Sequence, residues 1–113
     1  QFPDASFQQL WMLMVIVGSQ SYMNGLWLGN AVEDLDIYDL MRLLPQTDNR
    51  DIKTVYQNLL KGSRNHQRSF YAVLTNFKGA YSALFISPTL FTSIVTSAHE
   101  TAVVYDENGK ALP

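Results

Sequence analysis

The sequence predicts an all-α fold built around a hairpin of two long helices. In two segments, about 21–44 and 49–77, apolar residues recur at steps of three and four, which is the spacing of one face of a helix. A short polar segment, Gln46–Asn49, separates them. Because a connection this short leaves no room for a crossover, we expect the two helices to be antiparallel neighbours.

An earlier helix is expected at about 6–17. After Gln9 it is apolar on nearly every side, so it needs burial on more than one face. Asp4 or Ser6 is the expected cap, and Gly18 is the expected end. The longest apolar run has eight residues, whereas a helix that spans a bilayer needs ~20, so we predict no membrane-spanning segment.

The two long helices have their own start and stop signals. The first is expected to begin near Ser21 and to end at Leu44, because the following Pro45 disfavours helical geometry in the residue before it. For the second, Asn49 is a suitable cap and Gly79 marks the end. A helix followed by a tail is expected after this hairpin.

Ser87 followed by Pro88 is typical of a helix start and predicts a short helix at 88–96. The C-terminal tail, 97–113, contains an Asp-Glu-Asn-Gly turn and is either a small hairpin or an extended segment that docks elsewhere. We find no repeat, low-complexity stretch or linker, so residues 1–113 are expected to form a single domain.

The composition limits the classes of function. Apolar residues make up 47% and charged residues 16%, against ~25% charged in a typical soluble domain. A chain this poor in charge is either secreted or covered by partners, and an extracellular location is favoured without being decided. The net charge is −2 and the basic residues are scattered, which argues against a nucleic-acid partner. The absence of cysteine excludes disulfides and thiolate metal sites.

Two polar residues interrupt the apolar stripes of the long helices: Glu33 in the first and His66 in the second. Pairing Leu44 with Ile52 across the turn places Glu33 opposite Ser63, one helical turn from His66. The two side chains are therefore expected to meet inside the hairpin. They are either a metal half-site or a buried ion pair that fixes the helix register, and we favour the ion pair.

Three further acids, Asp34, Asp36 and Asp39, surround Glu33. They could form an acidic cation site, but a solvated helix face is the favoured interpretation. In that case Asp39 pairs with Arg42 or with Arg50 at the turn.

Aromatic and methionine side chains crowd the first helix and the start of the second. A cofactor pocket is one interpretation. An interface with another chain is favoured, because these residue types are enriched in interfaces. The residues proposed for this interface are Trp11, Met14, Tyr22 and Trp27.

Several motifs resemble one family. Gly29–Leu40 (GNAVEDLDIYDL), Gln46–Ile52 (QTDNRDI) and Gly62–His66 (GSRNH) are similar to the ferritin-like family catalogued as domain of unknown function 2202 (DUF2202), and the similarity continues through Ser97–Glu100. The resemblance implies a ferritin-like helical hairpin, the C-terminal half of a four-helix bundle, with short flanking helices. The family's N-terminal helix pair has no counterpart here. The chain is then a fragment, or a second copy or partner completes the bundle.

The resemblance also implies a metal site, from which this sequence departs. Ferritin-like di-iron proteins supply a Glu from one helix and Glu-x-x-His from the next. Glu33 fits the single Glu, and Ser63–His66 occupies the place of Glu-x-x-His with Ser63 where a carboxylate is expected. A bridging metal centre is thus short of ligands. We expect no cofactor, with iron or manganese bound by Glu33 and His66 as the alternative.

The expected function is that of a structural or interaction protein, a ferritin-like subunit that self-assembles or docks into a larger complex. The alternative is a di-metal protein binding iron or manganese, with oxidase or peroxide-scavenging activity. No catalytic residues are proposed, and the sequence favours a role other than that of an enzyme.

Overall fold

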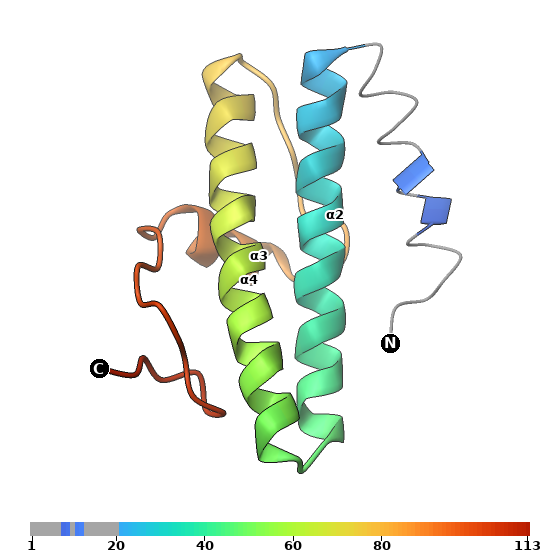
Figure 1. The fold of residues 1–113 in the computed structure, drawn as a ribbon. Coiled ribbons are helices and arrows are strands. Elements are labelled where there is room, and N and C mark those ends of the chain that lie inside the picture. The colour runs from blue at the N-terminus through green and yellow to red at the C-terminus, as the bar shows by residue number, and fades with distance from the viewer. Residues whose placement is uncertain (1–7, 10, 13–20) are drawn as a thin grey trace.

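The computed structural model describes residues 8–9, 11–12 and 21–113 (Figure 1). The regular elements of these ranges are α2 (Tyr22–Leu43), the 3₁₀ turn η1 (Leu44–Gln46), α3 (Arg50–Asn76) and α4 (Pro88–Val95). These residues contain no strand, only an isolated bridge between Tyr105 and Ala111, so the all-α prediction is confirmed. None of the helices in this part of the chain is long and apolar enough to cross a membrane.

Polar caps set the helix starts near where the sequence predicts them. At each start a side chain accepts a hydrogen bond from the backbone N–H three residues later: Ser21 at 3.3 Å, Asn49 at 3.0 Å and Ser87 at 3.1 Å. The first of the long helices ends within one residue of the predicted Leu44. Of the helix expected at 6–17, only residues 8–9 and 11–12 are described, and these are helical.

Helices α2 and α3 pack side by side as an antiparallel hairpin (Figure 1). Gly29 allows a close approach, since a Cβ at this position would lie 2.9 Å from the ring of Phe70. At the end of the hairpin away from the turn, the rings of Tyr22 and Phe77 pack edge to face, with their centroids 5.7 Å apart. These cross-helix pairs are shifted by three residues, slightly less than one helical turn, from the register derived from the turn, so that Glu33 faces His66 more directly than predicted.

The core lies between the hairpin, the segment that follows α3, and α4. Its buried apolar members come from all of these elements: Leu26, Ala31, Ile37, Leu40, Leu60, Leu74, Tyr81, Ile86, Phe91 and Ile94. Figure 1 shows the segment after α3 running back along the hairpin before α4 begins. This segment and α4 therefore cover one side of the hairpin.

We call residues 77–87, between α3 and α4, the returning segment. A buried carboxylate of α2 holds this segment by hydrogen bonds. Asp34 is fully buried and accepts a hydrogen bond from the Tyr81 hydroxyl at 2.6 Å. It also accepts hydrogen bonds from the backbone N–H groups of Leu84, Phe85 and Ile86, the shortest at 2.7 Å. The backbone N–H groups of this loop would otherwise be buried without an acceptor, and a single side chain supplies the acceptor for all of them.

The predicted solvated acidic face is therefore wrong for two of its three residues. Asp34 and Asp39 are fully buried, and only Asp36 keeps partial exposure. The expected pairing of Asp39 with Arg42 is confirmed, at 3.1 Å. Burial of Asp34 follows from the returning segment, which covers this side of α2 and supplies the donors.

The C-terminal tail lies along the side of α3 that faces away from α2 (Figure 1). Two asparagines of α3 each bind both the N–H and the C=O of one tail residue: Asn58 binds Tyr105 at 2.8 and 2.9 Å, and Asn65 binds Glu100 at 2.9 and 3.0 Å. The tail combines the two expected forms: it docks on α3, and its end folds back in a small antiparallel turn with a bridge between Tyr105 and Ala111.

Candidate functional site

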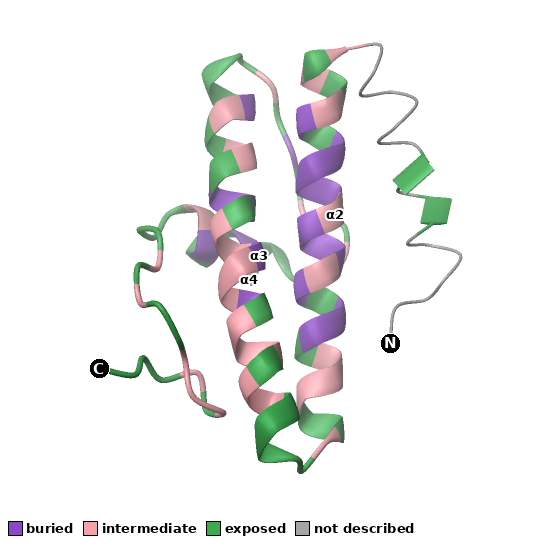
Figure 2. Ribbon diagram, in the orientation of Figure 1, coloured by how far each residue is buried: buried purple, intermediate pink, exposed green. Residues whose placement is uncertain are grey.

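A half-exposed row of apolar side chains runs the length of α3. We call it the α3 stripe, and its members recur at steps of three and four, except across a gap between Leu59 and His66: Ile52, Val55, Leu59, His66, Phe70, Val73 and Phe77. Val55 and Leu59 are 55% and 52% exposed, and Ile52 and Phe77 are similarly open. Figure 2 shows the half of α3 next to the turn coloured mainly as exposed and intermediate. The described residues thus cover the α3 stripe only in part.

Glu33 and His66 meet at this stripe, as the register predicted. Nδ1 of His66 lies 3.4 Å from Oε2 of Glu33. The Glu33 side chain is 12% exposed, whereas the imidazole is 68% exposed. The expectation that both side chains point into a helical core is therefore wrong for His66, whose imidazole the described residues leave largely exposed.

Burial gives Glu33 an unusual affinity for a proton. Loss of solvation raises the pKa of its carboxyl to about 7, and the nearby Ser63 hydroxyl works against this increase. Oε2 faces His66, whereas Oε1 is buried without a hydrogen-bond partner in the described part of the chain. At neutral pH this carboxyl can therefore exchange a proton.

The pKa of Asp36, one turn further along α2, is raised as well. Burial, followed by repulsion from Glu33 and Asp39, raises its pKa to about 7, and attraction to His66 opposes the increase. Two carboxyls with raised pKa values thus lie near one exposed imidazole. This is a concentration of titratable groups typical of functional sites, although structural charge networks produce it too.

A buried amide pair, missed at the sequence level, lies beside these groups. The Gln67 amide donates to Oδ1 of Asn30 at 2.7 Å, and Asn30 donates to the carbonyl of Leu26 at 2.9 Å. Both amides are fully buried, and Oε1 of Gln67 has no partner within the described residues. The signal was present, because Asn30 precedes Glu33 by one turn. We call the whole group the polar layer: Asn30, Glu33, Asp36, Ser63, His66 and Gln67.

The polar layer of one chain does not make a metal site. Within the described ranges, no three His, Cys, Asp or Glu side chains are arranged so that they could hold an ion. Glu33 and His66 as metal ligands therefore remain a prediction. The carboxylate missing at Ser63 is not replaced by another residue of the described chain.

The second charged cluster is structural. The carboxylate of Glu100 accepts hydrogen bonds at 2.7 Å from Arg64, Arg68 and the Tyr105 hydroxyl. These donors, Arg64 first, lower the pKa of Glu100 to about 2. The Arg and Asn of the GSRNH motif thus hold the tail, while its His belongs to the polar layer.

The aromatic residues proposed for an interface are largely accessible. Trp11 and Tyr22 are exposed, and Trp27 packs edge-on against Tyr81 with ring centroids 5.5 Å apart. Met14 lies outside the described residues. An interface at these residues stays a prediction.

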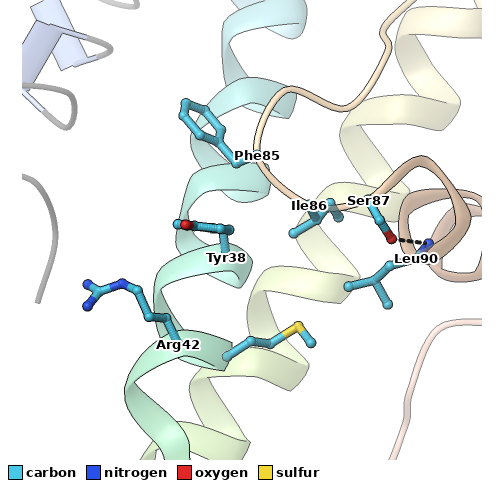
Figure 3. Close-up of a pocket in the computed structure, with 7 residues that line it drawn as sticks. Tyr38, Arg42, Phe85, Ile86, Ser87 and Leu90 are labelled. Atoms are coloured by element: carbon cyan, nitrogen blue, oxygen red, sulfur yellow. Dashed lines mark hydrogen bonds between the residues drawn. The ribbon is translucent and has the colours of Figure 1, made fainter. Parts of the chain in front are cut away.

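An open pocket of about 370 Å³ lies between α2 and α4. Its lining is mainly apolar: Tyr38, Met41, Arg42, Phe85, Ile86, Ser87 and Leu90. In Figure 3 the guanidinium of Arg42 points away from Ile86 and Leu90, and Arg42 is engaged by Asp39. The pocket lacks the converging polar groups that an active site requires.

A family model described as an uncharacterized protein domain (DUF2202) matches residues 1–98. This chain belongs to the DUF2202 family. The match ends two residues before Glu100, so the DUF2202 region contains the polar layer and the stripe but little of the tail. The DUF2202 part of the resemblance seen in the sequence is confirmed.

One DUF2202 relative is the uncharacterized protein MJ0754 of Methanocaldococcus jannaschii. It is 41% identical over 99 residues, which are 88% of this chain and 54% of that protein. The crystal structure of hypothetical protein MJ0754 from Methanococcus jannaschii superposes with a TM-score of 0.79 at 41% identity and covers 88% of this chain and 57% of that one. The present chain thus spans just over half the length of these relatives.

Proposed function

We propose that this DUF2202 domain is a structural subunit whose α2–α3 hairpin is one half of a ferritin-like four-helix bundle. The observation that carries this proposal is the half-exposed α3 stripe. Apart from His66, its members are apolar, and none carries a fixed charge. An apolar row that the described residues of its own domain leave half-exposed is typical of an interaction surface.

The geometry of the hairpin favours another pair of helices as the partner. Among the described residues, the segment after α3, α4 and the tail pack on other sides of the hairpin. They leave Ile52, Val55, Leu59 and Phe77 exposed, whereas Phe70 and Val73 also pack against the core. A second antiparallel pair laid on the stripe would bury it by interdigitating side chains at a shallow crossing angle. A second copy of this hairpin provides such a pair, so we propose self-assembly through the stripe.

The length of the relatives supports a bundle larger than one hairpin. MJ0754 contains nearly as many residues again as the region that matches this chain. The matched region accounts for one helical hairpin, so a further hairpin is compatible with the size of the family's longer members. We propose that in the assembly a second copy supplies a hairpin of this kind.

Native mass spectrometry and sedimentation equilibrium of the purified chain test the proposal. We expect a dimer or larger assembly that Leu59→Glu dissociates, because a carboxylate would be buried in the middle of the apolar contact. Val103→Glu is the matched control, since Val103 is an apolar tail residue that is 86% exposed and outside the stripe. A monomeric wild-type chain, or equal effects of both substitutions, would contradict self-assembly through the stripe.

The polar layer favours a second candidate function, that of a di-metal protein. Two copies packed on their stripes would bring together two each of Glu33, Asp36 and His66, and carboxylates with imidazoles suit iron and manganese. The missing carboxylate at Ser63 argues against it. Native mass spectrometry after incubation with Fe²⁺ or Mn²⁺ tests this second candidate. Stoichiometric metal that binds the wild-type chain and does not bind the Glu33→Gln variant supports a di-metal protein. An assembly that stays free of metal excludes it.

A further inference from the structure

We propose that the polar layer is completed between two copies: His66 of each copy keeps its own Glu33 and donates a hydrogen bond to the partner's Asp36. This inference rests on the proposed self-assembly and specifies which contact lies at its centre. It concerns only side chains of this chain and needs no ion.

The first observation is the position of His66 in the stripe. Three apolar residues precede it (Ile52, Val55 and Leu59) and three follow it (Phe70, Val73 and Phe77). A two-fold axis that lets two full stripes overlap therefore passes close to His66. Glu33 is likewise near the middle of α2, which runs from Tyr22 to Leu43. Two-fold pairing thus places the two polar layers against each other.

The second observation is the hydrogen-bonding capacity that one chain leaves unused. His66 turns Nδ1 to Glu33 at 3.4 Å, and its ring is 68% exposed. Its other nitrogen, Nε2, is therefore available to a second acceptor. Asp36 is such an acceptor, because it is half-buried and forms no hydrogen bond or ion pair with the described residues.

The third observation is charge. Asp36 experiences repulsion from Glu33 and Asp39 and attraction to His66, so these groups share one electrostatic environment. Two copies without a donor between them would place four carboxyls, Glu33 and Asp36 from each, in one contact. His66 is the nitrogen-bearing side chain of the stripe that can separate them. A polar pair at the centre of an apolar contact also fixes its register.

Two variants separate this arrangement from a purely apolar contact. One chain carries His66→Leu and the other carries Asp36→Leu. If the contact is only apolar, His66→Leu lengthens the row of apolar residues and the dimer becomes tighter. If His66 binds the partner's Asp36, the same variant dimerises about tenfold more weakly, which corresponds to ~1.4 kcal/mol.

Mixing the two variants gives the decisive measurement. The mixed dimer regains one His66–Asp36 pair and sets the two introduced leucines opposite each other, whereas each homodimer lacks both pairs. We expect native mass spectrometry to show more mixed dimer than a random distribution gives. His99→Leu is the control, since His99 is an exposed histidine that contacts Ser69 at 3.0 Å, and it should leave the dissociation constant unchanged.

The outcomes distinguish the two proposals. A dimeric wild type whose His66→Leu variant is equally tight or tighter, with random mixing, overturns the cross-copy contact but leaves self-assembly standing. Because His66 is exposed in the single chain, this variant is expected to fold, and it decides the matter even if Asp36→Leu does not. A wild-type chain that stays monomeric at its solubility limit overturns both.

Discussion

At the scale of single residues, two neighbouring acids of α2 have opposite roles. Asp34 is fully buried and its carboxylate accepts hydrogen bonds from one hydroxyl and three backbone N–H groups. Glu33 is nearly as buried but leaves Oε1 without a partner within the described residues. Desolvation of a carboxylate is offset by hydrogen bonds in the first case and largely uncompensated in the second. Asp34 therefore stabilises the fold, and Glu33 in its ionised form weakens it.

Replacement of Asp34 by Ala should be strongly destabilising. The substitution leaves three backbone N–H groups and the Tyr81 hydroxyl without their acceptor, at a cost of roughly 3 kcal/mol or more in the free energy of unfolding. Chemical denaturation measures it. Asp48→Ala, at an exposed turn position, is the control and should change stability little. A loss below about 1 kcal/mol for Asp34→Ala would show that the returning segment is held by its apolar contacts instead.

Glu33 should make stability fall as pH rises through neutrality. Its pKa is raised from 4.5 to about 7 in the folded chain, so the folded state binds the proton more tightly than the unfolded state. The free energy of unfolding is then highest below about pH 4.5 as far as this group is concerned, and it decreases between pH 4.5 and 7 by on the order of 1–2 kcal/mol. Asp36 acts in the same direction.

Urea titrations at pH 5, 6, 7 and 8 measure this dependence. Glu33→Gln keeps the shape and removes the ionisation, so its stability should vary less over the same range. With the imidazole exposed, we expect Glu33→Gln to be neutral or stabilising at pH 8, and a loss there would contradict the burial argument.

At the scale of elements, local signals were sufficient and distant contacts were not. The caps Asn49 and Ser87 and the stop before Pro45 are encoded within a few residues of where they act, and the sequence predicted them. The register across the turn was predicted only to within one helical turn. The acceptor role of Asp34 depends on groups about 50 positions away, and that of Glu100 on α3 side chains about 35 away. Periodicity shows which residues share a face, but not whether anything covers it, which is why the exposure of His66 was missed.

The tail is an element whose attachment depends on one carboxylate. Glu100→Gln should weaken its docking by on the order of 1–2 kcal/mol, since the hydrogen bonds from Arg64 and Arg68 lose their charge assistance in a partly solvated cluster. Hydrogen exchange of the tail amides, Tyr105 above all, measures the release. The wild-type tail should behave likewise in acid: the pKa of Glu100 is lowered to about 2, so its contribution is present above about pH 4.5 and is lost toward pH 2.

Glu107→Gln provides a control for the tail. Glu107 forms a long contact of 3.9 Å with the exposed Arg50, so its loss should leave amide exchange near Glu100 unchanged. Unchanged amide exchange in both variants would mean that the hydrogen bonds of Asn58 and Asn65 hold the tail without help from the Glu100 carboxylate.

At the scale of the whole molecule, the described residues cover the sides of the hairpin unequally. The returning segment, α4 and the tail all pack against the hairpin, yet the α3 stripe remains half-exposed. The sequence predicted the hairpin and its apolar rows, but it could not show which row the domain covers by itself. The proposed assembly explains both the exposure of the stripe and the unused hydrogen-bonding groups of the polar layer, because both surfaces face the second copy.

If folding of the chain is coupled to this assembly, its thermal stability must depend on concentration. A partner that binds only the folded state raises the unfolding midpoint as its concentration rises, by mass action. We expect the midpoint of the wild-type chain to increase over a hundredfold concentration range, by an amount that corresponds to up to ~2.7 kcal/mol per site. Leu59→Glu should abolish the dependence while keeping the helical circular dichroism signal, because Leu59 is half-exposed in the single chain. A midpoint that is independent of concentration in both proteins would show that the hairpin is stable alone, and that its apolar stripe is not used to hold a second copy.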